Sequence, residues 1–223
     1  MTEVVIRAER RWPMAVAVLA AIALQVATPR RGRLGVWWLF PVLELVLLIV
    51  IIVQDPRRID EPSRRARITT IALIALMTVV TMGGVYVLIY DILTGHLPSW
   101  VSSHESLNAT NLLGRGAALW VTNVIVFSLW FWEFDRGGPV ARASGRDVPA
   151  TFAFPENATP ELVPGEWIPR YPDYLYLAFT NATAFSPTDT LPVRTWAKMT
   201  MMAQSALSLV IAILVVARAI NVL

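Results

Sequence analysis

The sequence contains no cysteine and few charged residues. Of its 223 residues, 16% are charged and 56% are hydrophobic, whereas a typical soluble domain is about 25% charged. A chain so poor in charge cannot cover a water-facing surface. The absence of cysteine excludes disulfides, thiolate nucleophiles and cysteine-based metal sites. The composition therefore indicates an all-α integral membrane protein.

Five long apolar segments predict membrane-spanning helices. They lie at residues 12–29, 34–54, 68–94, 110–134 and 194–221. At 1.5 Å per residue, such helices cross a hydrocarbon core of about 30 Å. The first segment also fits a signal peptide, but we interpret it as a retained span.

The domain organisation follows from these segments. We expect residues 1–134 to form a four-helix transmembrane bundle and residues 135–172 to form a linker rich in proline and glycine. That linker is expected to lack helix, although its "TFAF" stretch at 151–154 could pack back on the bundle. Residues 173–223 form a third region, which contains the last span.

The basic residues predict the orientation of the chain. The net charge is +3, and the arginines cluster in short connections rather than on a nucleic-acid-binding patch. The connection between the second and third segments is the most basic, with Arg57, Arg58, Arg64, Arg65 and Arg67. Short basic loops stay in the cytoplasm, so we expect a cytoplasmic amino terminus in a bacterial cytoplasmic membrane.

A half-length segment precedes the last span. Pro172 and Asp173 suit the start of a helix, and Pro187 stops it after roughly half a membrane depth. The oxygen-rich stretch that follows is tolerated at membrane depth only where protein or water covers it. We therefore expect a re-entrant half-helix and five full spans. The alternative is that residues 173–190 cross completely, which gives six spans.

The last 50 residues resemble the pore helix, filter and inner helix of tetrameric potassium channels. The matching positions are the aromatic residues Tyr174, Tyr176 and Phe179, then Thr180, Thr183, Asp189 and Pro192. The resemblance implies a homotetramer with a central ion pathway. The whole chain, including "FWEFDRGGPVAR", also resembles a group of uncharacterised bacterial multi-span membrane proteins.

One departure from the channel pattern changes the expected chemistry. No glycine lies between Ala178 and Val193, and a potassium filter needs glycines to aim its carbonyls at the ion. Side-chain oxygens would have to replace the hydration shell instead, and a ring of carboxylates would favour cations. The candidate pore residues are Thr180, Asn181, Thr183, Ser186, Thr188 and Asp189. With the amino terminus inside, this hairpin would open toward the cytoplasm.

Two further features carry polar groups into apolar segments. Glu44 lies among leucines and valines, where an ionisable group costs at least about 2.5 kcal/mol. It either holds helices together, with Arg115 as one candidate partner, or handles ions or protons. In the last span, Gln204, Ser205, Ser208 and Ala212 form a narrow face that serves either helix packing or a pore.

These observations leave three functional hypotheses. The first is an oligomeric, channel-like protein that passes cations but lacks the standard potassium filter. The second is a non-conducting membrane protein that uses the hairpin for assembly or for binding a partner. The third is a small proton-coupled transporter that uses Glu44. We expect no enzymatic activity, no cofactor and no metal site, and we expect the lipid bilayer, inorganic ions and further copies of the chain as partners.

Overall fold

The structure is a computed structural model that describes residues 9, 11–28, 36–54, 64–99, 101, 109–144, 146–163, 167–183 and 189–222. Long helices dominate it: α1 (Trp12–Ala27), α2 (Leu39–Gln54), α3 (Arg64–Thr94), α4 (Ala109–Phe134) and α8 (Thr195–Val222). The shorter elements are η1 (Asp135–Gly137), α5 (Pro139–Ala143), β1 (Phe152–Ala153), α6 (Pro155–Ala158), η2 (Pro160–Leu162), α7 (Tyr171–Thr183) and β2 (Leu191–Pro192).

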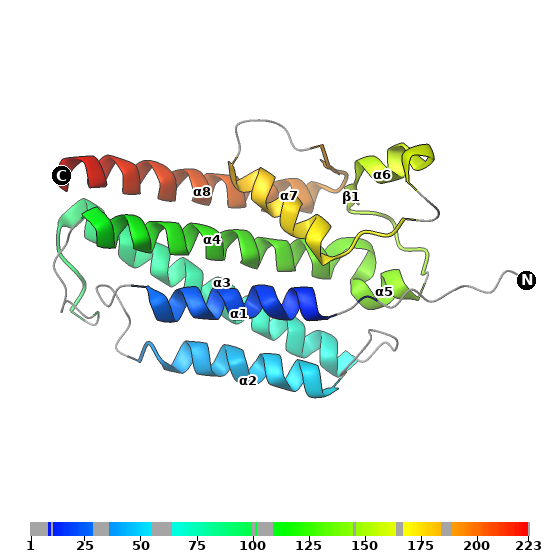
Figure 1. The fold of residues 1–223 in the computed structure, drawn as a ribbon, viewed down its shortest axis with the longest axis horizontal. Coiled ribbons are helices and arrows are strands. Elements are labelled where there is room, and N and C mark those ends of the chain that lie inside the picture. Colours follow the sequence, from blue (N-terminus) through cyan, green and yellow to red (C-terminus); the bar gives the residue numbers. More distant parts are fainter. Residues whose placement is uncertain are drawn as a thin grey trace, which may run out of the picture.

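The long helices lie side by side around α4 (Figure 1). α4 contacts α1, α3, α7 and α8, while α2 packs against α1 and α3. One end of the molecule holds the starts of α1, α3 and α8, the end of α4, and the short elements α5, α6 and β1 (Figure 1). We call this end the base end. The carboxyl terminus lies at the opposite, or far, end.

Three of the described helices are long and apolar enough to cross a membrane, by length and composition. They correspond to α3, α4 and α8. α1 and α2 are apolar but have only 16 residues each. α2 begins at Leu39 rather than at the predicted residue 34, because residues 36–38 form a turn and Pro41 then occupies the first helical turn, where proline is tolerated.

Residues 135–172 contain more helix than their composition predicts. The predicted absence of helix there is wrong, because the structure contains α5, α6 and η2 in this range. Each of the three has a proline in its first two positions. Proline fits there because the first amide groups of a helix have no partner within it. These helices have only three to five residues.

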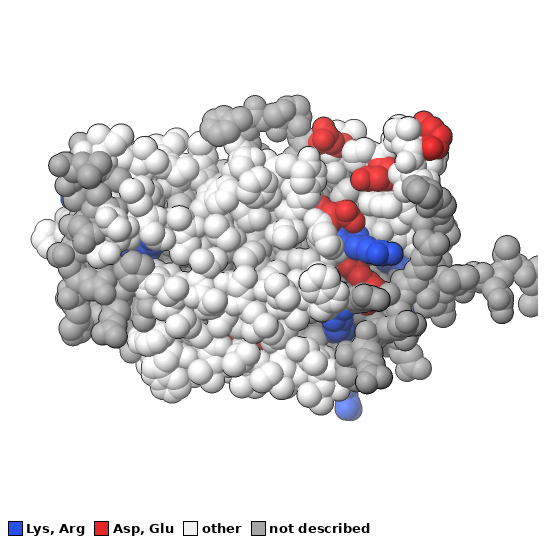
Figure 2. All heavy atoms as spheres, viewed as in Figure 1, with Lys and Arg blue, Asp and Glu red and all other residues white. Residues whose placement is uncertain are grey.

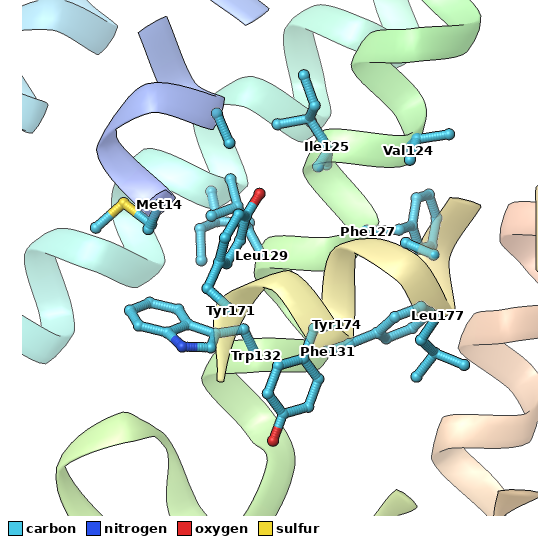
Figure 3. Close-up of a cluster of buried hydrophobic side chains, with 14 of the residues drawn as sticks. Met14, Val124, Ile125, Phe127, Leu129, Phe131, Trp132, Tyr171, Tyr174 and Leu177 are labelled. Carbon is cyan, nitrogen blue, oxygen red and sulfur yellow. The ribbon is translucent and has the colours of Figure 1, made fainter. Parts of the chain in front are cut away.

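An aromatic core joins α4, α7 and β1 near the base end. Figure 3 shows Phe131 and Trp132 of α4 beside Tyr171 and Tyr174 of α7. Phe152 packs edge-on against Phe131 and Tyr174, and Phe152 and Phe154 are both buried. The expectation that "TFAF" packs back on the bundle is confirmed.

A glycine sets the distance between α4 and α8. A Cβ atom placed on Gly116 would lie 2.5 Å from Cγ2 of Val215, which is far inside van der Waals contact. The two helix backbones therefore approach closely at this crossing, as small residues allow in membrane helices.

Charge is distributed unevenly over the surface. Figure 2 shows acidic and basic side chains gathered at the base end, while most side chains over the middle of this face are uncharged. Large apolar side chains are exposed on α2 and α8. An apolar girdle with charge concentrated near one end suits a protein that lies in a bilayer.

Candidate functional site

α7 and the segment that follows it form a hairpin at the base end. α7 has 13 residues, which is about 20 Å or two-thirds of a hydrocarbon core. At its start, the amide of Tyr171 donates to Oε1 of Glu9 at 2.7 Å. On the return, β2 pairs antiparallel with β1, and the amide of Val193 donates to the carbonyl of Thr151 at 2.9 Å. The chain thus enters and returns at the same end (Figure 1).

Asp173 stabilises the amino-terminal end of α7. Oδ2 of Asp173 accepts a hydrogen bond from the amide of Arg170 at 2.7 Å. Asp173 also lies in the first turn, where a negative charge interacts favourably with the helix dipole. The predicted helix start at Pro172 and Asp173 therefore lies within one residue of the observed one.

A buried carboxylate anchors the hairpin to the end of α4. Asp135 is fully buried, and its Oδ2 accepts a 2.6 Å hydrogen bond from the hydroxyl of Tyr174. Its Oδ1 accepts from the amide of Thr151 at 2.7 Å. One side chain thus binds α7 and the segment that leads into β1.

Arg142 completes this anchor from α5. Its Nη1 donates to the carbonyls of Trp132 and Asp135, at 2.8 and 2.7 Å. Its Nη2 lies 3.5 Å from Oε2 of Glu9, and its guanidinium lies over the ring of Tyr174, 5.0 Å from the centroid. We call Glu9, Asp135, Arg142 and Tyr174 the base cluster.

Glu9 brings the segment before α1 into the base cluster. Its carboxylate accepts hydrogen bonds from Nε1 of Trp132 at 3.0 Å and from the amide of Tyr171. Burial raises the pKa of Glu9, and the nearby charge of Arg142 opposes that rise. The group therefore holds its proton more tightly than a solvent-exposed glutamate does.

A glycine turn brings Arg142 back toward α4. Arg136, Gly137 and Gly138 all have positive φ angles, of 50°, 78° and 94°. A Cβ atom on Gly138 would lie 2.9 Å from the carbonyl oxygen of Glu133. The "DRGGP" sequence thus reverses the chain immediately after α4, and only a residue without a side chain fits at Gly138.

No functional role was predicted for "FWEFDRGGPVAR", the stretch that contains Asp135 and Arg142. A signal was present, because the stretch places two acids and two arginines around a Gly-Gly-Pro turn directly after an apolar segment. Charges in that position need partners if they become buried. The contribution of Glu9 could not be found in this way, because it lies far away in the sequence.

A second polar cluster joins α7 to α8 within the bundle. Nδ2 of Asn181 donates to the carbonyl of Met201 at 2.9 Å and to Oε1 of Gln204 at 2.7 Å. Nε2 of Gln204 donates to the carbonyl of Ala178 at 2.8 Å, and Ser205 donates to the carbonyl of Asn181. We call Asn181, Gln204 and Ser205 the amide cluster. It holds α7 and α8 together through side-chain hydrogen bonds.

The structure places the predicted pore residues in different surroundings. The hydroxyls of Thr180 and Thr183 donate to carbonyls of α7 itself, and Asn181 belongs to the buried amide cluster. Ser186 and Thr188 lie outside the described residues, as does Phe185. Asp189 is exposed and lies two residues before β2. Among the described members of this set, only Thr180, Thr183 and Asp189 have exposed or half-exposed side chains.

The four residues predicted to form one face of the last helix also differ in their exposure. Gln204 and Ser208 are buried, Ser205 is half-buried and Ala212 is exposed. Ser208 accepts a 2.8 Å hydrogen bond from Nδ2 of Asn123 on α4. Within the chain, the polar members of this face serve helix packing.

Glu44 is fully buried and is held by α1. Nε2 of Gln25 donates to both carboxylate oxygens, at 3.1 and 2.9 Å. The suggested partner Arg115 lies elsewhere, where its Nη1 is 3.9 Å from Oδ2 of Asp91 and its Nη2 donates to the carbonyl of Gly84. Arg115 lies early in α4, where α4 packs against α3, the helix that supplies Asp91. Glu44 lies on α2, which packs against α1, the helix that supplies Gln25.

No family model, curated protein or solved structure matches the chain. The features that bear on function are the hairpin, the two polar clusters that hold it, and the exposed Asp189 on its return.

Proposed function

We propose that the chain is a multi-pass protein of the bacterial cytoplasmic membrane with five spans and a re-entrant half-helix. The three long apolar helices support this, together with α1 and α2, whose 16 residues correspond to about 24 Å. The base end faces the cytoplasm in this proposal, because α2 ends and α3 begins there (Figure 1) and the sequence that connects them is basic. The carboxyl terminus then lies outside.

We further propose that copies of the chain assemble, as a tetramer, around a cation pathway lined by the hairpin. The observation that carries this proposal is the path of α7, which runs part of the way through the molecule before the chain returns to the same end. The carboxyl end of a helix carries partial negative charge, and α7 ends at Thr183, part of the way along the molecule (Figure 1). A cation close to this helix end would be stabilised.

The contacts within one subunit define where such a pathway would lie. Asn181 faces α8, so it is not available to an ion. The exposed face of α7 carries Tyr176 and Phe179, which are 55% and 50% exposed, and Thr180 and Thr183 lie along its margin. The pathway would therefore run between subunits, with the exposed Asp189 at its cytoplasmic mouth. A ring of these acids would favour cations over anions.

Reconstituted flux measurements test this proposal. The purified protein should be a stable tetramer and should pass monovalent cations in preference to chloride across liposomes. Asp189→Asn should lower that preference without dissociating the oligomer. Glu161→Gln is a matched control, because Glu161 is another exposed acid at the base end.

Two results would contradict the proposal. One is a monomer that nevertheless conducts, since the pathway is placed between subunits. The other is an equal loss of cation preference in the Asp189 and Glu161 variants, which would indicate a general surface-charge effect.

A non-conducting assembly or binding protein is the second candidate. The observation in its favour is that the amide cluster uses Asn181 and Gln204, the buried amide side chains of α7 and α8, for packing within the subunit. This candidate predicts the same oligomer without flux. Substitution of Tyr176 and Phe179 by alanine would then dissociate the oligomer, because these rings would form the subunit contact.

The proton-coupled transporter remains a third proposal, supported by the burial of Glu44 in an apolar helix. It predicts that a pH gradient drives uptake and that Glu44→Gln abolishes the coupling. Gln25 gives the acid a fixed hydrogen-bond partner, which equally suits a packing role.

A further inference from the structure

The exposed surfaces of α1 and α2 are apolar and lie on the side of the bundle opposite α8 (Figure 1). The two helices pack against each other, and α2 also packs against α3. Every exposed side chain of α1 and of residues 39–53 in α2 is apolar, and the acid of α2, Glu44, is fully buried. We call this surface the α1–α2 face. A surface without an exposed polar side chain suits contact with the acyl chains of lipids.

Prolines in the sequence limit the length of both helices. α1 ends before Thr28, whose ψ angle of 139° is extended, and Pro29 follows. α2 ends at Gln54, and Asp55 and Pro56 follow in the sequence. The residue before a proline is disfavoured in the helical conformation, so the sequence opposes continuation of either helix. Each has 16 residues, or about 24 Å, against a hydrocarbon core of about 30 Å.

α8 presents a longer apolar surface than α1 and α2 do. Its exposed large apolar side chains run over residues 196–220, which is a rise of about 36 Å. Even the part between its two basic residues, 199–216, rises by about 26 Å, whereas the equivalent runs at 12–26 and 39–53 rise by about 21 Å each. The three helices run in nearly the same direction, and α4 and α8 reach further toward the far end (Figure 1). The apolar surface is therefore shorter on the α1–α2 face.

Exposed tryptophans mark the two ends of the α1–α2 face. Trp12 is 62% exposed at the start of α1, at the base end, and Trp38 is 55% exposed directly before α2, at the far end. Indole rings favour the headgroup layers on both sides of a bilayer. The face thus has a headgroup anchor at each end and apolar side chains between them. A contact between two copies of the chain would not require indoles at both levels, so the pattern favours lipid as the occupant.

We propose that the α1–α2 face is covered by a locally thinned bilayer and selects phospholipids with short acyl chains, of about 14 carbons. A bilayer accommodates a short span by thinning, at a modest cost for each ångström of mismatch. Short-chain lipids form a thinner layer and so lower this cost. If about 30 Å corresponds to chains of 18 carbons, proportional scaling gives roughly 23 Å for 14 carbons. The proposal rests on the proposed location of the chain in a bilayer and is independent of assembly and conduction.

Lipid competition at two labelled positions tests this proposal. The chain contains no cysteine, so a thiol-reactive fluorophore can be placed at one site at a time. Ile49→Cys places it on the α1–α2 face and Ile213→Cys places it on α8, where the parent side chains are 50% and 56% exposed. Each labelled protein is reconstituted into liposomes of two phosphatidylcholines, with monounsaturated chains of 14 and 18 carbons. One lipid carries bromine atoms as a quencher, and a second sample exchanges the brominated lipid. The quenching gives the ratio of the two lipids beside each label.

The two positions should differ in the lipid that surrounds them. At Ile49→Cys we expect the 14-carbon lipid to be enriched about threefold over its share of the bilayer, and at Ile213→Cys we expect no enrichment. Equal ratios at the two positions would overturn the proposal. Weak quenching by both lipids at Ile49→Cys alone would also overturn it, because a protein surface would then cover the face. Absence of quenching at both positions would overturn the proposed location in the bilayer, and this proposal with it.

A longer α2 provides a matched pair of variants. Two leucines inserted between Ile52 and Val53 add about 3 Å of apolar helix, so the enrichment at Ile49→Cys should fall toward the value at Ile213→Cys. Two serines inserted at the same place add the same length without apolar surface and should leave the enrichment near threefold. An unchanged ratio in the leucine variant would overturn the proposal. The comparison of Ile49→Cys with Ile213→Cys decides the question if an insertion prevents folding.

Discussion

At the scale of single residues, the buried charges of the base cluster have several partners each. Arg142 contacts two carbonyls, a carboxylate and an aromatic ring, and Asp135 accepts from a hydroxyl and a backbone amide. A buried ion pair is weak evidence for stability, because desolvation offsets the attraction between the charges. The base cluster therefore fixes where α7 begins more than it adds net stability.

Removal of the Tyr174 hydroxyl tests whether the base cluster anchors α7. Tyr174→Phe deletes the 2.6 Å hydrogen bond to Asp135 and leaves a buried carboxylate oxygen without that donor. Hydrogen bonds to charged groups contribute about 1.5–3 kcal/mol, so the melting temperature should fall by roughly 3–12 °C for a chain of this size. Thermal unfolding in detergent measures this shift. Tyr176→Phe is the control, since Tyr176 is 55% exposed, and similar losses in both variants would contradict the anchoring role of Tyr174.

Substitutions of Glu44 test the environment of that acid. Glu44→Gln keeps the shape of the side chain and can still accept from Gln25, so expression and thermal stability should change little. Glu44→Lys places a positive charge among apolar helices, where insertion scales assign about 2.5–3.5 kcal/mol to such a group. Expression in membranes and melting temperature are the measurements. If the two variants are equally stable, Glu44 faces water.

The sequence predicted the burial of Glu44 but not its partner. Hydropathy identifies a charge among leucines and valines, whereas the choice between Gln25 and Arg115 depends on which helices are neighbours. Likewise, the oxygen-rich composition of residues 180–189 is plain in the sequence. That Asn181 turns toward Gln204 of α8 depends on how α7 rotates as it packs, which composition does not determine.

At the scale of elements, the long helices were predictable because hydrophobic runs and helix length follow from the bilayer thickness. The predicted bounds for the first, fourth and last spans agree with α1, α4 and α8 to within two residues. The short helices α5, α6 and η2 were missed, since each depends on a proline at its start, which hydropathy does not register.

The crossing of α4 and α8 gives a prediction at this scale. Gly116→Ala places a methyl group against Val215, whose β-branched side chain moves little, and such overpacking costs about 1–3 kcal/mol. Gly114→Ala has nothing within 4 Å, so it should be neutral or slightly stabilising. The measurement is thermal unfolding of both variants. Val215→Ala should restore stability in the Gly116→Ala background, and a failure to rescue would place the strain elsewhere.

At the scale of the whole molecule, the proposed topology depends on the hairpin. With α7 entering and returning at the base end, the starts of α1, α3 and α8 all lie at that end, and α8 then runs to the far end (Figure 1). A full crossing at residues 173–190 would instead separate β2 from β1, which are paired.

Cysteine labelling can test this topology without background, because the chain contains no cysteine. Thr94→Cys lies at the far end of α3, and Leu191→Cys and Glu161→Cys lie at the base end. In intact cells stripped of their outer barrier, a membrane-impermeant maleimide should label only Thr94→Cys. The other two positions should react after permeabilisation. Labelling of Leu191→Cys in intact cells would support six spans.

The hydrogen bond between Glu9 and Tyr171 has a consequence for how the protein is made. Its two partners are 162 residues apart in sequence. At ~5–20 residues per second, a ribosome needs roughly 8–32 s to synthesise the second after the first. During this interval Glu9, which precedes α1, lacks this contact. Docking of the hairpin is then a late event in biogenesis, and a nascent chain arrested after α4 would leave the aromatic side chains at the end of α4 uncovered and open to proteases.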